Sequence, residues 1–529
     1  MAEIKKENEE LNKGLRLIAK SSFIIFICLF IGKILVYIYR AIIARFLNPE
    51  VFGLYSLAIM ISSWFALIAS LGFSENLPRY MPIFRGKKRL DNVQYIFRFS
   101  LKFLTISSLI AAGILFILSK FIAINIFHNS ELIIFLRYFS LAVPLIVIAT
   151  PFIAALRSYE KITWHALIGY IFHNIVSVIS IIILLYLGLH TKAIIFSYLL
   201  GIFITLASAY IISKKVIPEI FRRDFKIDKE KKQISKEFIM NSLPLLFASF
   251  VGVLSAWIDS FSLGFYKSAF EVGLYNAAMP IAMLLGITPE LFMQLYVVLI
   301  GKEYAKNNNG TIKELTKQIE KWIFIINLPA FILIFTFPDV FLNILFGQNY
   351  IISKYALRIL VIGTFSLSII GPTSRKLILM AGKSKLLLYN TIIFAGSNFL
   401  LNSILVPMEK IGTIDNANGL VGAAIATVIS SLIFSIITII QIKTNLSFVP
   451  LRKKMLRVLM AGLLATIPLL FFKQFFVINL TSLVLLGILF ISSYILLIFI
   501  TGCLDKNDLL ILGSIKKKFF SKKSQYITN

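Results

Sequence analysis

The sequence has few of the side chains from which catalytic and metal sites are built. Its 529 residues include two cysteines and four histidines, and only 15% of the residues are charged. Cys28 and Cys503 lie far apart in apolar segments, which gives no indication of a disulfide framework. His165 and His173 are eight residues apart, too far for both to bind one metal ion without further ligands. We therefore expect neither a metal site nor a cofactor.

Motifs typical of hydrolases and nucleotide-binding enzymes are also absent. There is no His-Glu-x-x-His and no Gly-x-Ser-x-Gly sequence. Residues 382–384 match the last residues of a phosphate-binding P-loop, but Leu377 occupies the position of the first required glycine and no strand precedes it. The predicted loops are too short for a separate catalytic domain. We therefore predict that the protein is not an enzyme.

The amount of apolar sequence excludes a water-soluble globule. Hydrophobic side chains make up 58% of the chain and occur in long runs almost from end to end. A bilayer-spanning helix needs roughly 20 apolar residues. The pattern predicts an all-α polytopic membrane protein with about 14 transmembrane helices. The first apolar run is too long for a cleavable signal peptide, so we expect it to act as an uncleaved signal.

The charged residues are mostly basic, but their distribution argues against nucleic-acid binding. The chain has 54 Lys and Arg residues against 25 Asp and Glu residues, a net charge of +29. The basic residues recur in every second predicted loop, which is the positive-inside pattern of multi-pass proteins. The pattern predicts a cytoplasmic (cell) membrane protein with both termini in the cytoplasm. It also predicts contacts with anionic membrane lipids and no nucleic-acid partner.

Two segments that lie 220 residues apart share the motif Gly-Leu-Tyr-x-x-Ala, at residues 53–58 and 273–278. A repeat at that distance indicates two similar halves. We expect two pseudo-repeated six-helix lobes, joined by a basic cytoplasmic linker and followed by two further helices with a basic cytoplasmic tail. The expected divisions are residues 1–213, 214–237, 238–442 and 443–529. The halves run parallel, as in transporters that bind their substrate between two repeats.

Cationic side chains occur inside the first apolar helix. Lys33 lies near its middle, where a lysine facing lipid costs at least roughly 2.5 kcal/mol. Arg40 follows seven residues later on nearly the same face, and Tyr37 lies one turn from both. We predict that this face binds substrate in a hydrated cavity. The alternatives are a structural ion pair for Lys33 and an interfacial anchor for Arg40.

Asp259 is the acidic residue of greatest interest, because it lies in an otherwise apolar helix. Gly252, Ser255 and Ser262 flank it at helical spacing and form a small, polar face that could line a cavity. We predict Asp259 as a binding site for a coupling ion, H⁺ or Na⁺. The alternative is that Asp259 only neutralises one of the cations of the first helix.

Three further charged residues are weaker candidates. Arg79 is a candidate substrate-binding residue near the end of the second helix, but Glu75 lies four residues before it and can pair with it. Glu290 follows Pro289 in the eighth helix. None of these positions has the spacing of a catalytic motif, so no catalytic residue is predicted.

Four segments match motifs of a known family. They are the Ala-Arg-Phe-Leu-Asn-Pro turn with the following Phe-Gly-Leu-Tyr at residues 44–55, the segments 72–80 and 259–278, and the Gly-x-x-Gly-Ala-Ala-Ile-Ala-Thr sequence at 419–427. Together they resemble the polysaccharide biosynthesis (flippase) family over nearly the whole chain. The resemblance implies the superfamily that also contains the multidrug and toxin extrusion (MATE) antiporters and the lipid II flippases.

This resemblance implies a fold and a function. Members have two six-helix lobes in a V shape, and they move polyprenyl-linked sugars from the cytoplasmic to the outer leaflet. A cationic lumen holds the pyrophosphate and acidic sugars, a role that suits Lys33 and Arg40 because both stabilise phosphate by charge-assisted hydrogen bonds. The expected substrate is thus a lipid-linked oligosaccharide or polysaccharide repeat unit. Glycosyltransferases of the same pathway are candidate partners.

The hypothesis is therefore a flippase that works by alternating access. Either an H⁺ or Na⁺ gradient acting at Asp259 or the membrane potential acting on an anionic headgroup could supply the energy. A cation-coupled small-molecule antiporter of the multidrug type is the alternative with the same fold. A membrane-embedded glycan polymerase or glycosyltransferase is disfavoured, because the longest loop is cytoplasmic and rich in lysine.

Overall fold

A computed structural model describes residues 2–222, 225–306, 308–412, 414–475, 480–505 and 508 of the chain. The first half is helical throughout. Its helices are α1 (Ala2–Phe46), α2 (Pro49–Ala69), α3 (Phe73–Gly86), α4 (Leu90–Phe121), α5 (Leu132–Ser140), α6 (Ala142–Ser158), α7 (Ile162–Ala166), α8 (His173–Tyr186) and α9 (His190–Val216). Two π-helical segments, η1 (Ile122–Ile126) and η2 (Leu167–Phe172), continue α4 and join α7 to α8.

The second half, after the short helix η3 (Pro218–Phe221), is also mainly helical. Its helices are α10 (Lys229–Tyr266), α11 (Ala269–Met283), α12 (Ile287–Ala305), α13 (Asn309–Thr336), α14 (Pro338–Leu345), α15 (Lys354–Met380), α16 (Ser384–Leu405), α17 (Leu420–Leu446), α18 (Lys454–Lys473) and α19 (Leu480–Ile500). The two-residue strands β1 (Lys410–Ile411) and β2 (Ile414–Asp415) pair antiparallel between α16 and α17.

The expected class of protein is confirmed. Fourteen segments of the described chain are helical, long and apolar enough to cross a membrane. Many of their large hydrophobic side chains are exposed, as lipid-facing residues must be. The chain is thus an all-α, multi-pass membrane protein. The division into lobes and linker stays a prediction, and most of the expected basic tail lies outside the described residues.

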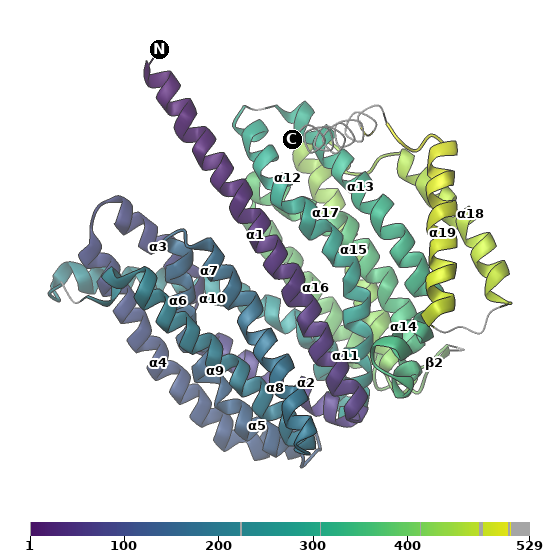
Figure 1. The fold of residues 1–529 in the computed structure, drawn as a ribbon, viewed down its shortest axis with the longest axis horizontal. Coiled ribbons are helices and arrows are strands. Elements are labelled where there is room, and N and C mark those ends of the chain that lie inside the picture. The colour runs from purple at the N-terminus through teal and green to yellow at the C-terminus, as the bar shows by residue number, and fades with distance from the viewer. Residues whose placement is uncertain are drawn as a thin grey trace, which may run out of the picture.

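The helices form two bundles that splay apart toward the end at which the N-terminus lies (Figure 1). One bundle contains α3, α4, α6 and α9, and the other contains α12, α13, α15 and α17. Helix α1 runs between them, and α18 and α19 lie at the outer edge of the second bundle (Figure 1).

The bundles meet at the first turns of α2 and α11, which carry the repeated motif. A Cβ atom added at Gly53 would lie 1.6 Å from the Ala269 carbonyl oxygen, and one at Gly273 would lie 1.9 Å from the Pro49 carbonyl oxygen. The two backbones therefore touch where only glycine leaves room. We call this contact between Gly53 and Gly273 the joint.

Further contacts between the bundles surround the joint. The Phe52 ring of α2 packs against Phe346 and Tyr350, with ring centroids 6.3 Å away in both cases. The Arg45 side chain at the end of α1 donates to the main-chain carbonyls of Asn343 and Ile344 at the end of α14. Cations stabilise the C-terminal end of a helix, so this contact adds to the joint.

The structure differs from expectation at the end of α2. A single helix is expected over residues 51–81, but α2 ends at Ala69 and α3 begins at Phe73. Leu71 and Gly72 adopt positive φ angles of 51° and 71°. A Cβ at Gly72 would lie 2.3 Å from the Ser242 carbonyl oxygen of α10. The helix is interrupted because α10 packs directly against this turn.

A charged cluster attaches the last two helices to the second bundle. Lys321 of α13, which is completely buried, donates to Asp505 at 2.7 Å and also to Asp508. Arg452 and Lys454, at the start of α18, also donate to Asp505. We call these five residues the clamp. It ties α13, α18 and the segment after α19 together beside the apolar core that these helices share.

Gly53→Ala is expected to destabilise the joint. The added methyl group overlaps a main-chain oxygen, so α2 and α11 must move apart, and overpacking of this kind typically costs about 1–3 kcal/mol. Thermal unfolding of the purified protein in detergent measures the effect. The matched control is Gly113→Ala on α4, where an added Cβ meets no atom within 4 Å. A melting temperature equal to that of the wild type for Gly53→Ala would contradict the prediction.

Asp505→Asn is expected to weaken the clamp in a pH-dependent way. Burial raises the pKa of Asp505, but hydrogen bonds from Lys321 and Lys454 outweigh it and hold the pKa at about 2. A carboxyl with a lowered folded-state pKa stabilises the fold above its unfolded pKa and loses that contribution as the pH falls toward the folded value. The variant should therefore melt at a lower temperature at neutral pH.

The melting temperature of Asp505→Asn is expected to lie below that of the wild type at neutral pH, and this difference should shrink between about pH 4 and about pH 2. Melting curves of both proteins over this range make the comparison. Glu237→Gln, at an exposed position on α10, controls for loss of a carboxylate elsewhere. A difference in melting temperature that stays constant down to the lowest pH would show that loss of the Asp505 charge does not cause the destabilisation.

Candidate functional site

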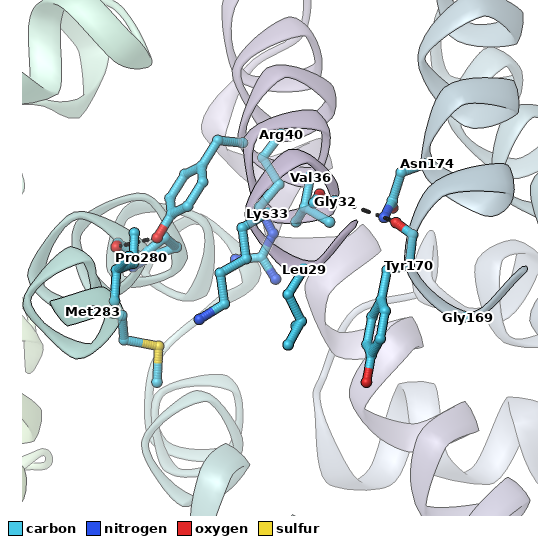
Figure 2. Close-up of a pocket in the computed structure, with 12 residues that line it drawn as sticks. Leu29, Gly32, Lys33, Val36, Arg40, Gly169, Tyr170, Asn174, Pro280 and Met283 are labelled. Atoms are coloured by element: carbon cyan, nitrogen blue, oxygen red, sulfur yellow. Dashed lines mark hydrogen bonds between the residues drawn. The ribbon is translucent and has the colours of Figure 1, made fainter. Parts of the chain in front are cut away.

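A hollow of about 290 Å³ lies between α1, the η2–α8 segment and α11. Six residues of α1 line it, among them Lys33, Tyr37 and Arg40. Figure 2 shows Lys33 and Arg40 projecting from α1, with Pro280 and Met283 on one side and Tyr170 and Asn174 on the other. The three residues of α1 predicted to form one polar face therefore line the same hollow.

Two more hollows adjoin the first. One of about 460 Å³ lies between α12, α15 and their neighbours, and one of about 300 Å³ lies between α1, α12 and α15. Seven residues each line two of the three hollows: Leu29, Lys33, Met283, Ile287, Glu290, Met293 and Lys376. We therefore treat them as compartments of one central cavity between the bundles. Its size lies in the range usual for ligand sites.

The central cavity is cationic. Its lining contains four basic side chains, Lys33, Arg40, Arg375 and Lys376, and one acidic side chain, Glu290. The Lys33 ammonium lies 2.6 Å from a Glu290 carboxylate oxygen, and both side chains are partly exposed. Glu290 pairs with Lys33, and the lining holds no second acidic side chain among the described residues for the other three cations.

Arg40, Arg375 and Lys376 make no ion pair or hydrogen bond within the part of the chain that the structure describes. Arg40 is half-buried in the wall of the cavity. The Arg375 guanidinium lies over the Phe434 ring, 5.2 Å from its centroid, which fixes the side chain without neutralising it. These cations are available to an anion that enters the cavity.

The α1 wall of the cavity is held by neighbouring helices. The Tyr37 hydroxyl donates to the Pro280 carbonyl oxygen of α11 at 2.6 Å. The Asn174 amide donates to the Tyr170 carbonyl at 2.7 Å and to the Gly32 carbonyl at 3.4 Å, which links α8 to α1. Gly32 permits this approach, since a Cβ there would lie 2.5 Å from the Tyr170 carbonyl oxygen.

Several sequence-based expectations can be compared with this geometry. Lys33 does form an ion pair, but with Glu290, which the sequence ranks as a weaker candidate. Arg79 is exposed on α3 and is not among the residues lining the central cavity. No ion pair joins it to Glu75 among the described residues. Its role in substrate binding stays a prediction, as do those of Lys33, Tyr37 and Arg40.

Arg375 and Lys376 are cavity residues that sequence reasoning missed. They follow Gly371-Pro372, which lies inside the apolar helix α15 and lines the same compartment. Proline cannot donate the hydrogen bond expected in a helix interior, so it is unusual at such a position. The combination of this Gly-Pro pair with two adjacent cations is the signal in the sequence that could have revealed them.

A second polar site surrounds Asp259, whose side chain is 8% exposed. Tyr275 and Thr427 each donate to Oδ2 at 2.7 Å, and the Asn402 amide donates to Oδ1 at 2.8 Å. Asn402 also donates to Asn398 Oδ1 at 2.7 Å. Asp259 thus lies among hydroxyl and amide groups of α11, α16 and α17. We call these five residues the Asp259 site.

The hydrogen-bond partners of Asp259 described above come from other helices, not from the small, polar face of its own helix. Gly252 faces open space, and the Ser255 hydroxyl donates to the Val251 carbonyl instead. No ion pair connects Asp259 to Lys33, Arg40 or another cation of the described residues. The alternative that Asp259 neutralises the cations of α1 is therefore not supported. The described residues contain no group of three or more His, Cys, Asp or Glu that could hold a metal ion.

The two bundles and the cavity between them define the class of protein as a membrane protein with the two-bundle fold of transporters. The same fold occurs in the lipid II flippase MurJ in an inward closed conformation, with a TM-score of 0.70, 16% identity, and coverage of 90% of this chain and 98% of that one. It also occurs in an inward-facing MATE-family multidrug transporter, with a TM-score of 0.61 and 16% identity. That match covers 78% of this chain and 95% of the transporter.

Sequence comparison gives the family. The model of the polysaccharide biosynthesis protein family matches residues 18–296, and the MatE model matches residues 244–404. The chain therefore belongs to the polysaccharide biosynthesis protein family, whose MATE-type relatives share its fold. This membership confirms the resemblance found in the motifs and places the chain among membrane flippases and transporters.

Individual relatives agree with this assignment. An uncharacterized membrane protein of Methanocaldococcus jannaschii is 25% identical over 493 residues, which is 89% of this chain and 92% of that protein. A probable low-salt glycan biosynthesis flippase of Haloferax volcanii is 24% identical over 265 residues, 50% of this chain and 51% of its own length. A putative O-antigen transporter of Shigella flexneri is 25% identical over 339 residues, which is 61% of this chain and 75% of that protein.

Proposed function

We propose that the protein is a flippase that moves a lipid-linked oligosaccharide or polysaccharide repeat unit across the cytoplasmic membrane by alternating access. The observation that carries the proposal is the set of three unpaired cations, Arg40, Arg375 and Lys376, in a cavity between the two bundles. The names of the glycan flippase and O-antigen transporter relatives support the class of substrate.

The chemistry of the cavity favours a diphosphate-linked headgroup. Placing cations together without counterions is unfavourable, so the cavity gains stability when an anion neutralises them. Guanidinium groups bind phosphate oxygens with two parallel hydrogen bonds, and the lysine ammonium adds a point charge. Arg40 lies on the first bundle's side of the cavity and Arg375 on the second, so one headgroup contacting both would connect the bundles.

The Lys33–Glu290 pair fits the same proposal. In the absence of substrate, the Glu290 carboxylate occupies the position that an anionic group of the substrate would take beside Lys33. Both side chains are partly exposed, so exchanging the carboxylate for a phosphate costs little. This exchange would also break a contact between α1 and α12, since the pair joins these helices.

The proposed orientation follows the distribution of basic residues. With both termini in the cytoplasm, the bundles splay toward the cytoplasm and the joint closes the outer side (Figure 1). A headgroup would enter from the cytoplasmic leaflet while its lipid tail stays in or beside the bilayer. Anionic lipids would contact the basic loops, and glycosyltransferases of the same pathway would supply the substrate.

The Asp259 site supports coupling to H⁺ or Na⁺. It offers a carboxylate together with amide and hydroxyl oxygens of Asn398, Asn402 and Thr427, the oxygen ligands that hard cations prefer. The Asn402 amide oxygen has no hydrogen-bond partner in the described part of the chain, which leaves it free to bind an ion. An ion bound here would connect α10, α16 and α17 and so influence how the second bundle moves.

Arg40→Ala and Arg375→Ala are each expected to slow headgroup translocation at least about tenfold. A hydrogen bond to a charged group contributes about 1.5–3 kcal/mol, and 1.4 kcal/mol corresponds to a factor of about ten. Translocation of a fluorescent polyprenyl-diphosphate oligosaccharide in proteoliposomes provides the measurement. Lys120→Ala, an exposed position at the far end of α4, controls for loss of a cation outside the cavity. Unchanged rates in both arginine variants would refute the proposal.

Asp259→Asn is expected to abolish the acceleration of flipping by an imposed H⁺ or Na⁺ gradient, while flipping without a gradient persists. Asparagine keeps the size of the side chain but removes the negative charge that attracts a cation. The same proteoliposomes, assayed with each gradient in turn, identify the ion. Full retention of the gradient response would exclude the Asp259 site as the place where the coupling ion acts.

A further inference from the structure

An apolar hollow of about 490 Å³ lies between α2, α10 and α16. It is separate from the central cavity, because the two share no lining residue. Nine residues line the hollow, and among them only Trp64 carries a polar atom in its side chain. The hollow therefore differs in chemistry from the cationic cavity, and it suits a hydrocarbon ligand.

The hollow is open toward the bilayer. Ile392 and Phe399 of α16, which line it, are 46% and 48% exposed. Both lie in a span that is long and apolar enough to cross a membrane, so their exposed surfaces contact lipid. Between them lies Gly396, where an added Cβ would meet no atom within 4 Å. The missing side chain leaves room for a hydrocarbon chain that comes from the bilayer.

Both halves of the chain contribute to the hollow. Trp64 belongs to α2 in the first half, whereas α10 and α16 belong to the second. The Trp64 ring lies 5.8 Å from the Phe261 ring of α10, measured between centroids. The shape of the hollow therefore depends on how α2 lies against α10. A chain bound here contacts elements that must move relative to each other if the transporter alternates between two states.

Helix α16 extends from the central cavity to the hollow. Leu387, near its start, lines the compartment that also contains Arg375 and Lys376. Ile392 follows five residues later and lines the hollow. A rise of 1.5 Å per residue places it about 7.5 Å further along the helix axis. A cationic compartment and an apolar hollow thus lie close together along one helix, as a ligand with an anionic head and an apolar tail requires.

From this arrangement we infer that the hollow holds part of the polyprenyl tail of the substrate while the headgroup occupies the central cavity. The inference rests on the proposed function, because it requires a substrate with an anionic headgroup and a long apolar tail. Tight packing of the tail against the aromatic and branched side chains of the wall stabilises it there. The hollow is then the tail-binding part of the substrate site.

A polyprenyl chain suits the hollow better than the straight acyl chain of a bilayer lipid does. Each isoprene unit carries a methyl branch, which fills a wide space such as the one over Gly396. Each unit also contains a double bond, whose π electrons can accept a weak hydrogen bond from an N–H group. Trp64 offers such a donor, because its indole N–H is buried and has no partner among the described residues.

The test maps the position of the tail. A polyprenyl-diphosphate oligosaccharide with a photoreactive diazirine in its tail is illuminated with the wild-type protein in proteoliposomes, and mass spectrometry identifies the labelled residues. We expect labelling to concentrate in residues 251–261 and 392–399, and an excess of unlabelled polyprenyl diphosphate should prevent it. A phospholipid with the same diazirine in its acyl chain should instead label lipid-facing residues of many helices.

Gly396→Leu fills the hollow and should reduce this labelling at least about tenfold, the loss of affinity expected when roughly two methylene groups are no longer buried. Gly113→Leu is the matched control. Gly113 lies exposed on α4, and an added Cβ there also meets no atom within 4 Å. This variant should be labelled like the wild type.

The outcomes separate this inference from the proposed function. Tail labels spread evenly over lipid-facing helices, or unchanged in Gly396→Leu, would refute the hollow as the tail site and leave headgroup transport unaffected. Failure of the wild-type protein to translocate the headgroup would refute the proposed function and the inference with it. If Gly396→Leu does not fold, the competition by polyprenyl diphosphate in the wild type decides the question, since labelling that persists in its presence would overturn the inference.

Discussion

The contact between Gly53 and Gly273 is the constraint on which the rest of the structure depends. The first turns of α2 and α11 touch through their backbones, and each glycine faces the main chain of the other helix. The joint holds the bundles together at one end, and they splay apart toward the other end (Figure 1). The central cavity lies between them, and α1 runs along it from the open end to the joint.

The two kinds of charge inside the protein lie in different places. Arg40, Arg375 and Lys376 line the cavity without an ion-pair partner among the described residues, and this arrangement favours an anionic ligand over a cationic drug. The acid Asp259 is withdrawn into the second bundle. A transporter in which substrate and coupling ion have opposite charge can keep them apart in this way and link them through the movement of shared helices.

Much of the fold is predictable from the sequence because it depends on local patterns. Apolar runs, basic loops and the repeated motif indicate the fourteen spans and the two halves, since each signal lies within a single segment. The interruption at Leu71 and Gly72 was not predicted, because it depends on the approach of Ser242, which is remote in sequence. Local periodicity cannot reveal such a contact.

The candidate site was also predictable where it depends on one segment, and not where it depends on contacts between remote segments. Lys33, Tyr37 and Arg40 are predictable as one face because they share a helix. Asp259 is conspicuous as a charge in an apolar segment, but its partners Asn402 and Thr427 are neutral residues on other helices. Nothing near Asp259 in the sequence points to them.

The central claim is that an anionic lipid-linked headgroup occupies the cavity between the bundles. Substrate protection of a cysteine at Val36, which lines the cavity beside Lys33, tests it most directly, after both native cysteines are replaced by serine. A polyprenyl-diphosphate oligosaccharide should slow the reaction of this cysteine with a maleimide, and a polyprenol without phosphate or sugar should not. Equal labelling rates with and without the diphosphate-linked sugar would contradict the account.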